Sequence, residues 1–180
     1  MQNKRGVGGL SAAVYRMKRW NLVNQAALLV YANRDKYAYL YGANGEIGSD
    51  ALVDKLWKQY PEHFAKTVTG TGRTIKNLKD HVRGKICYDC SSFINFITAA
   101  PADLNSWMLH DHMNVIRSPR EGTAGSILWK AGHVAIDVGY GIAIDFANEF
   151  IDCRMYPLAN GKFTISGELD FVDYTDTNSR

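Results

Sequence analysis

Apolar residues in the first half of the chain recur at the spacing of α-helices. The segment 21–31 (NLVNQAALLVY) has one apolar face, and Asn21 is placed to cap it. The segment 49–60 repeats the pattern behind Ser49, a preferred N-cap residue. A shorter and more polar helix is predicted over 74–83. The sequence therefore predicts that helices come first in this chain.

The second half changes to a period of two, which is typical of strands. Val134, Ile136 and Val138 alternate with other residues, and a glycine-containing turn then leads to another apolar segment. Strands are predicted at 126–129, 133–139, 142–147, 152–157 and 162–173. Helices followed by antiparallel strands, without an internal repeat, predict an α+β fold.

Cys90 lies where a short polar stretch meets an apolar one. Asp89 to Ser92 is suited to opening a helix, and Phe93 to Ile97 has the apolar spacing of a buried helix. A cysteine at this junction lies beside the positive end of the helix dipole, which favours the nucleophilic thiolate. The alternative is a small, buried and unreactive cysteine.

His133 opens the first of two strands that form a predicted hairpin. Asp145 lies on the second strand, so the two side chains are expected to be neighbours. A cysteine, a histidine and a carboxylate in this chain order can serve as nucleophile, base and orienting group. The pattern predicts a thiol-dependent active site made of Cys90, His133 and Asp145.

Three motifs resemble those of the NlpC-type cell-wall peptidases, which are papain-like. Residues 89–93 (DCSSF) resemble the Asp-Cys-Ser-Gly-Phe nucleophile motif, and 132–136 (GHVAI) resemble the Gly-His-Val-Gly-Ile base motif. Residues 39–43 (YLYGA) are similar to the Tyr-x-Trp-Gly-Gly segment, and Asp145 falls at the third polar position. The resemblance covers roughly 22–174.

The chain departs from the family pattern at four places. Ser92 and Ala135 replace glycines, and both are small. Asp145 stands where histidine, asparagine or glutamine is more usual, which leaves the third role open. Segment 44–85 is a longer link than compact members have, and could form a lobe that tunes specificity.

The resemblance implies a papain-like cysteine peptidase fold and a peptidoglycan hydrolase. Such enzymes cut stem peptides, commonly between D-glutamate and a diamino acid, and related members are N-acetylmuramoyl-L-alanine amidases. Catalysis would use Cys90, His133 and Asp145, with no cofactor and no metal. Substrate contacts would come from Tyr39, Asp89, Ser91 and Trp129; Asp89 would receive the free amine of a stem peptide, cap the helix, or do both.

Two other functions fit the same residues. One is a non-catalytic module that binds the cell wall, and the other is a papain-like enzyme that acts on proteins or other amides. The complete Cys-His-Asp order favours an enzyme, because a binding module has no need of all three.

Composition indicates one ordinary globular domain. The 180 residues are 46% hydrophobic and 22% charged. We expect a catalytic domain over 22–180 and a basic arm or short helix over 1–21. The net charge of +3 suits peptidoglycan and its anionic wall polymers and is too small to indicate nucleic acid. No apolar run reaches the ~18 residues of a transmembrane helix.

Three cysteines, an odd number, argue against a disulfide-based scaffold. Cys87 and Cys90 form a C-x-x-C pair without the further ligands that zinc requires, and a disulfide between them would silence the nucleophile. Cys153 is predicted to be a core residue. His110 and His112 form an H-x-H pair for which no third ligand is placed.

The expected place of action is the cell wall. No apolar segment of signal-peptide length precedes Trp20, so the resemblance suggests synthesis in the cytoplasm followed by phage release, toxin-like delivery or non-standard export. The oligomeric state is left open by the sequence.

Overall fold

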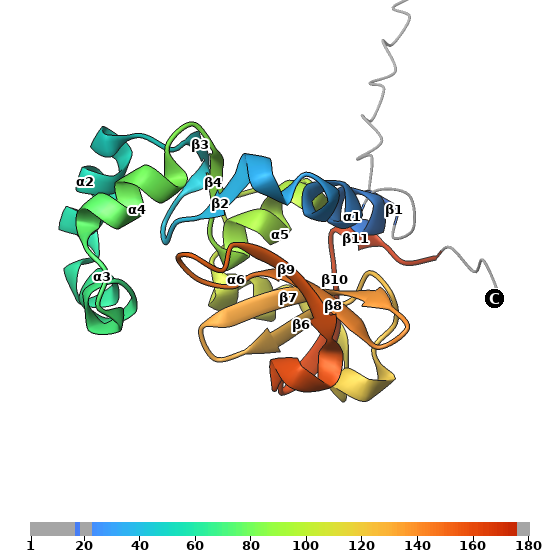
Figure 1. Ribbon diagram of the computed structural model, residues 1–180. Coiled ribbons are helices and arrows are strands. Elements are labelled where there is room, and N and C mark those ends of the chain that lie inside the picture. Colours follow the sequence, from blue (N-terminus) through green and yellow to red (C-terminus); the bar gives the residue numbers. More distant parts are fainter. Residues whose placement is uncertain (1–16, 19–22, 176–180) are drawn as a thin grey trace, which may run out of the picture.

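The computed structural model describes residues 17–18 and 23–175 (Figure 1). The helices are α1 (Asn24–Ala32), α2 (Asp50–Gln59), α3 (Pro61–Thr67), α4 (Ile75–Val82), α5 (Cys90–Thr98) and α6 (Ser106–Asp111). The strands are β1 (Met17–Lys18), β2 (Tyr37–Tyr39), β3 (Asn44–Ile47), β4 (Ile86–Tyr88), β5 (Met113–Arg117), β6 (Ile127–Lys130), β7 (His133–Gly139), β8 (Ile142–Phe146), β9 (Cys153–Pro157), β10 (Ile165–Leu169) and β11 (Val172–Asp173).

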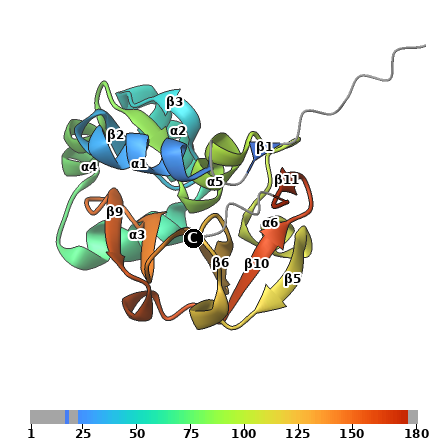
Figure 2. The same ribbon diagram turned by 90° about the vertical axis from the view of Figure 1, so that its right-hand side faces the viewer.

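The C-terminal half forms a six-stranded antiparallel sheet in the order β5-β10-β6-β7-β8-β9. Figure 2 shows β9 and β5 at opposite sides of this sheet. N-terminal helices followed by an antiparallel sheet make this an α+β protein, as the hydrophobic pattern predicts.

The main core lies between α5 and one face of the sheet. Alternation puts Val134 and Ile136 of β7 on this face, together with Ile144 and Phe146 of β8. Phe93 on α5 is fully buried, and its ring centroid is 4.9 Å from that of Phe146. The helix that begins at Cys90 is thereby fixed against the strands that carry His133 and Asp145.

A three-stranded sheet in the order β2-β4-β3 precedes α5. β2 pairs with β4 in parallel, and β3 pairs with it in antiparallel fashion. β4 ends at Tyr88, two residues before Cys90, so this small sheet sets where α5 begins. The sequence did not predict these strands, because runs of three or four residues show too little alternation.

Segment 44–85 contains three helices with a core of their own. Leu52, Val53 and Leu56 of α2 pack with Phe64 of α3 and Leu78 of α4 in a cluster separate from the main core. We call α2, α3, α4 and their connections the helical lobe; it lies at the left of Figure 1. α3 starts at Pro61 and was not predicted.

The loop between β8 and β9, residues 147–152, is tied to the helical lobe by contacts that include two histidine–carboxylate pairs. His63 on α3 has its Nε2 atom 3.0 Å from Oε1 of Glu149. His81 on α4 has its Nε2 atom 2.8 Å from Oδ2 of Asp152. The strand pair that carries Asp145 is therefore connected to the lobe through histidine–carboxylate pairs.

The predicted helix starts are confirmed where caps lie in the described residues. Ser49 caps α2 by accepting from the backbone N–H of Leu52, and Thr74 caps α4 together with Asn77. α1 begins at Asn24 without a side-chain cap, and the predicted cap Asn21 lies outside the described residues.

The predicted strand at 162–173 is wrong as one element, because a turn at Asp170 and Phe171 separates β10 from β11. The region around His110 divides into α6 and β5, and the sequence did not predict β5.

The basic arm at 1–21 lies outside the described residues except for Met17 and Lys18, which pair in parallel with β11. Within the described ranges, no helix is long and apolar enough to cross a membrane.

Candidate active site

Asp89 caps α5 and places Cys90 as its first residue. Oδ1 of Asp89 accepts from the backbone N–H groups of Ser91 at 3.0 Å and Ser92 at 2.8 Å. The Ser92 hydroxyl in turn accepts from the backbone N–H of Asp89 at 2.8 Å, which completes a capping box. The predicted helix start is therefore confirmed, and the backbone N–H of Cys90 lies at the positive end of the helix.

The Cys90 thiol is free and buried, with 7% of the residue exposed. Backbone N–H groups of Val134 and Ser91 lie near the sulfur and act to lower its pKa. Because Val134 directly follows His133, the sulfur lies against the start of β7, whereas the His133 ring stacks on Phe163 on the other face of the sheet.

His133 and Asp145 form a direct pair, as the predicted hairpin requires. Nε2 of His133 lies 2.7 Å from Oδ2 of Asp145, whose side chain is fully buried. With Nε2 directed at the carboxylate, Nδ1 is the ring atom left to exchange a proton with another group. Among the described residues, no hydrogen bond joins this ring to the Cys90 thiol.

Two residues on β9 also hold Asp145, and the sequence did not predict them. Arg154 donates from Nε to Oδ1 at 2.8 Å, and the Tyr156 hydroxyl donates to Oδ2 at 2.8 Å. Burial acts to raise the pKa of Asp145, but the hydrogen bonds from His133 and Arg154 outweigh it, so the pKa is lowered. Asp145 is therefore a charged acceptor with four donated bonds, counting a second one from Arg154 at 3.2 Å.

The expected low pKa of Cys90 is wrong for this structure. Burial, followed by the charge of Asp89, raises the pKa of the thiol to about 12. The neighbouring backbone amides of Val134 and Ser91 do not offset the loss of water around the sulfur. The resting residue is therefore a thiol rather than a thiolate.

Tyr39 is buried beside Cys90, with 4% of the residue exposed. Burial raises the pKa of its hydroxyl, and the charges of Cys90, Glu149 and Asp89 raise it further. Its backbone N–H donates to Oδ1 of Asp152 at 2.8 Å. Tyr39 therefore lies within electrostatic reach of the cysteine, on a strand held in place by the β8–β9 loop.

The other predicted substrate contacts are occupied by bonds within the protein. The Ser91 hydroxyl donates to Oδ1 of Asp89 at 2.9 Å. Trp129 donates from Nε1 to the backbone oxygen of Ser106 at 2.8 Å, and its ring packs against Trp107 of α6. Asp89, the predicted amine acceptor, already receives the three hydrogen bonds from Ser91 and Ser92 and one from Gly42.

Cys87 and Cys90 belong to different parts of the fold. Cys87 packs in the core of the helical lobe, whereas Cys90 packs in the main core, and both are free in this structure. Cys153 is buried in the main core, as predicted. The described residues contain no group of three or more histidine, cysteine or acidic side chains placed to hold a metal ion.

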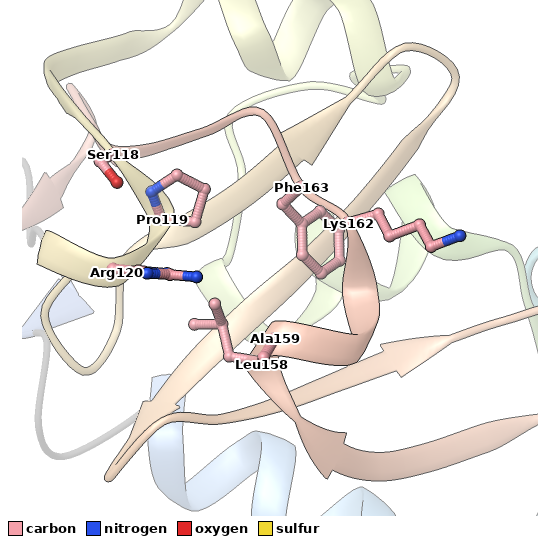
Figure 3. Close-up of a pocket in the computed structure, with 7 residues that line it drawn as sticks. All are labelled: Ser118, Pro119, Arg120, Leu158, Ala159, Lys162 and Phe163. Carbon is pink, nitrogen blue, oxygen red and sulfur yellow. The ribbon is translucent and has the colours of Figure 1, made fainter.

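The face of the sheet opposite α5 carries a pocket of about 210 Å³ (Figure 3). Phe163 lines this pocket and stacks on His133, with ring centroids 6.1 Å apart and an interplanar angle of 13°. Arg120 and Lys162 give the lining a positive charge. The full lining is Ser118, Pro119, Arg120, Leu158, Ala159, Lys162 and Phe163.

No family model matches this chain, and the search of curated proteins found no match.

Proposed function

We propose that this protein is a papain-like peptidoglycan hydrolase that cleaves an amide bond of cell-wall stem peptides through Cys90. One observation carries the proposal. His133 is held by buried Asp145 at 2.7 Å, directly beside the residue whose amide faces the Cys90 sulfur at the start of α5. A nucleophile at a helix start, a base and an orienting carboxylate are the groups that thiol hydrolysis requires, and the pairing of the last two supports this proposal.

In the proposed reaction, Nδ1 of His133 takes the proton of the Cys90 thiol as the sulfur attacks the substrate carbonyl. Asp145 stabilises the imidazolium through Nε2, and its low pKa keeps it charged. The backbone N–H of Cys90 donates to the developing oxyanion, and one such donor typically contributes about 3 kcal/mol. His133 then gives the proton to the leaving amine, and water hydrolyses the thioester.

The substrate class follows from the motif resemblance around Cys90, His133 and Tyr39. We favour cleavage between D-glutamate and a diamino acid, with N-acetylmuramoyl-L-alanine amidase activity as the alternative on the same residues. The protein would then act on the cell wall, and its anionic polymers would attract the net positive charge.

A non-catalytic wall-binding module is the second candidate, and one observation favours it. The Cys90 thiol has a pKa of about 12 and shares no hydrogen bond with the imidazole of His133 in the described residues. Such a cysteine can be a core residue that has no role in chemistry.

Digestion of purified peptidoglycan under reducing conditions separates these candidates. We expect wild type to release soluble muropeptides, Cys90→Ala to release none, and the matched control Cys87→Ala to retain activity. The masses of the products identify the bond. Equal release by wild type and Cys90→Ala would contradict the proposed nucleophile, and tight wall binding by both without release would favour the binding module.

A further inference from the structure

We propose that the pocket between Tyr41 and α3 is a subsite for an ammonium group carried by the molecule that reaches Cys90. The inference rests on the proposed function in one respect, because it assumes that a substrate is presented to Cys90. It adds a requirement on the substrate that Cys90, His133 and Asp145 do not impose. The substrate must carry a positively charged group where it faces the helical lobe.

The pocket combines aromatic faces with negative charge. Its volume is about 390 Å³, and it is lined by Tyr41, Gln59, Tyr60, Pro61, Glu62 and His63. The rings of Tyr41 and His63 stack with centroids 3.8 Å apart, and Tyr60 meets Tyr41 edge-on at 5.0 Å. This lining contains an acidic side chain and no lysine or arginine, and aromatic faces attract ammonium groups.

A buried carboxylate lies behind the pocket. Glu149 is 2% exposed, its Oε1 lies 3.0 Å from Nε2 of His63, and its Oε2 has no hydrogen-bond partner among the described residues. With the Nε2 proton directed at Glu149, Nδ1 of His63 can accept an N–H from a ligand. Glu149 therefore both orients the imidazole and adds negative charge to the pocket.

The pocket is joined to the candidate active site through Tyr41 and its neighbour. Tyr41 packs against the main core, which contains Cys90, and the backbone N–H of Gly42 donates to Oδ2 of Asp89 at 3.2 Å. Burial raises the pKa of the Tyr41 hydroxyl, and the charges of Asp89, Cys90 and Glu149 are among the causes that raise it further. One tyrosine thus lies within electrostatic reach of both the cysteine and the buried glutamate.

The amine of a diamino acid side chain is a group of this kind. The proposed substrate carries such an amine in its stem peptide, on the residue next to the bond we expect to be cut. A neutral sugar could also stack on the tyrosines, but it would gain nothing from the charge of Glu62 or Glu149. The test therefore compares ligands that differ only in the ammonium group.

Binding is measured first, on the full-length Cys90→Ala protein by NMR titration. The probes are Nα-acetyl-L-lysine N-methylamide and the norleucine analogue, which has no ammonium group. We expect shifts centred on residues 59–63 and an affinity about tenfold higher for the lysine probe. Adding Glu149→Gln, which keeps an acceptor for His63, or the exposed change Glu62→Gln should lower this affinity several-fold. Adding Glu121→Gln, an exposed control outside the pocket, should not. Equal affinity for both probes would overturn the inference.

Digestion by wild type is measured second, on peptidoglycan with free or chemically acetylated side-chain amines. If the wall is cut, acetylation should slow cleavage about tenfold, and an unchanged rate would overturn the subsite while the proposed function stands. If no wall is cut but the lysine probe binds at residues 59–63, the subsite stands and the proposed function fails.

Discussion

At the scale of single residues, the central feature is a nucleophile that rests in its protonated form. Burial raises the pKa of Cys90 to about 12, whereas hydrogen bonds keep Asp145 charged. The thiolate can then form only as the proton moves to His133. This differs from sites in which a thiolate–imidazolium pair exists before substrate arrives.

The pH dependence of alkylation tests this protonation state. Far below the pKa, the thiolate fraction rises tenfold for each pH unit, so the rate of Cys90 modification by iodoacetamide should rise from pH 6 to 10 without a plateau. The rate is read by mass spectrometry of the peptide that contains Cys90, with glutathione as the reference thiol. A plateau below pH 8 would instead indicate a preformed ion pair.

At the scale of elements, the start of α5 is joined to the turn after β2. Oδ2 of Asp89 accepts from Gly42, and the Ser92 hydroxyl donates to the backbone oxygen of Ala43 at 2.7 Å. The cap therefore satisfies helix N–H groups and also anchors the helix to the small sheet. Ser49 at the start of α2 accepts from a single backbone N–H.

Removal of the Asp89 cap should lower the free energy of unfolding more than removal of the Ser49 cap. We expect Asp89→Ala to lower the free energy of unfolding by about 2 kcal/mol or more and Ser49→Ala by about 1 kcal/mol, because Asp89 accepts bonds at both oxygens. Urea denaturation measures both values. Asp89→Asn is the matched control, since asparagine also caps helices, and it should cost less than Asp89→Ala. Equal losses for the two alanine variants would show that the link to Gly42 contributes nothing.

Local signals explain which elements the sequence predicts. α2 and α4 each combine a cap with an apolar period, and β7 alternates over seven residues, so all three were found. β2 and β4 have three residues each, and α3 buries only Phe64, so these elements lack a period that can be detected.

The residues of the candidate site likewise fall into those that the sequence predicts and those that it does not. Cys90, His133 and Asp145 belong to motifs, and the hairpin turn predicts that the last two are neighbours. Arg154 reaches Asp145 only through the pairing of β8 with β9, and Glu149 meets His63 across 86 positions of sequence. The predicted strands at 142–147 and 152–157 could have indicated the first contact, whereas the second depends on the assembled fold and has no local signal.

At the scale of the whole molecule, the main core and the core of the helical lobe each contain buried thiols. Cys87 lies in the core of the helical lobe, and Cys90 and Cys153 lie in the main core. Burial raises the pKa of each to about 12. The folded state keeps these protons, whereas the unfolded chain loses them near pH 8.5–9. The contribution of the thiols to the free energy of unfolding is therefore fully present below that range and is lost as pH rises towards 12.

We expect the free energy of unfolding to fall by roughly 1–2 kcal/mol per thiol between pH 8 and 10. Urea denaturation at a series of pH values measures this slope, and pH 10 is the upper limit because tyrosines also titrate above it. Cys90→Ala and Cys153→Ala should each reduce the slope by about one third. If the free energy of unfolding of both variants falls with pH as steeply as that of wild type, thiol burial does not govern alkaline stability.

The two histidine–carboxylate pairs between the helical lobe and the β8–β9 loop have a consequence for how this sequence can evolve. A descendant that lost the lobe would leave Glu149 buried without His63, and Asp152 without His81. An unpaired buried carboxylate such as Glu149 is costly, so such a deletion would survive only with compensating changes in the loop. Selection is therefore expected to act on these two distant segments together, with positions 63 and 149, and 81 and 152, changing as pairs across homologues.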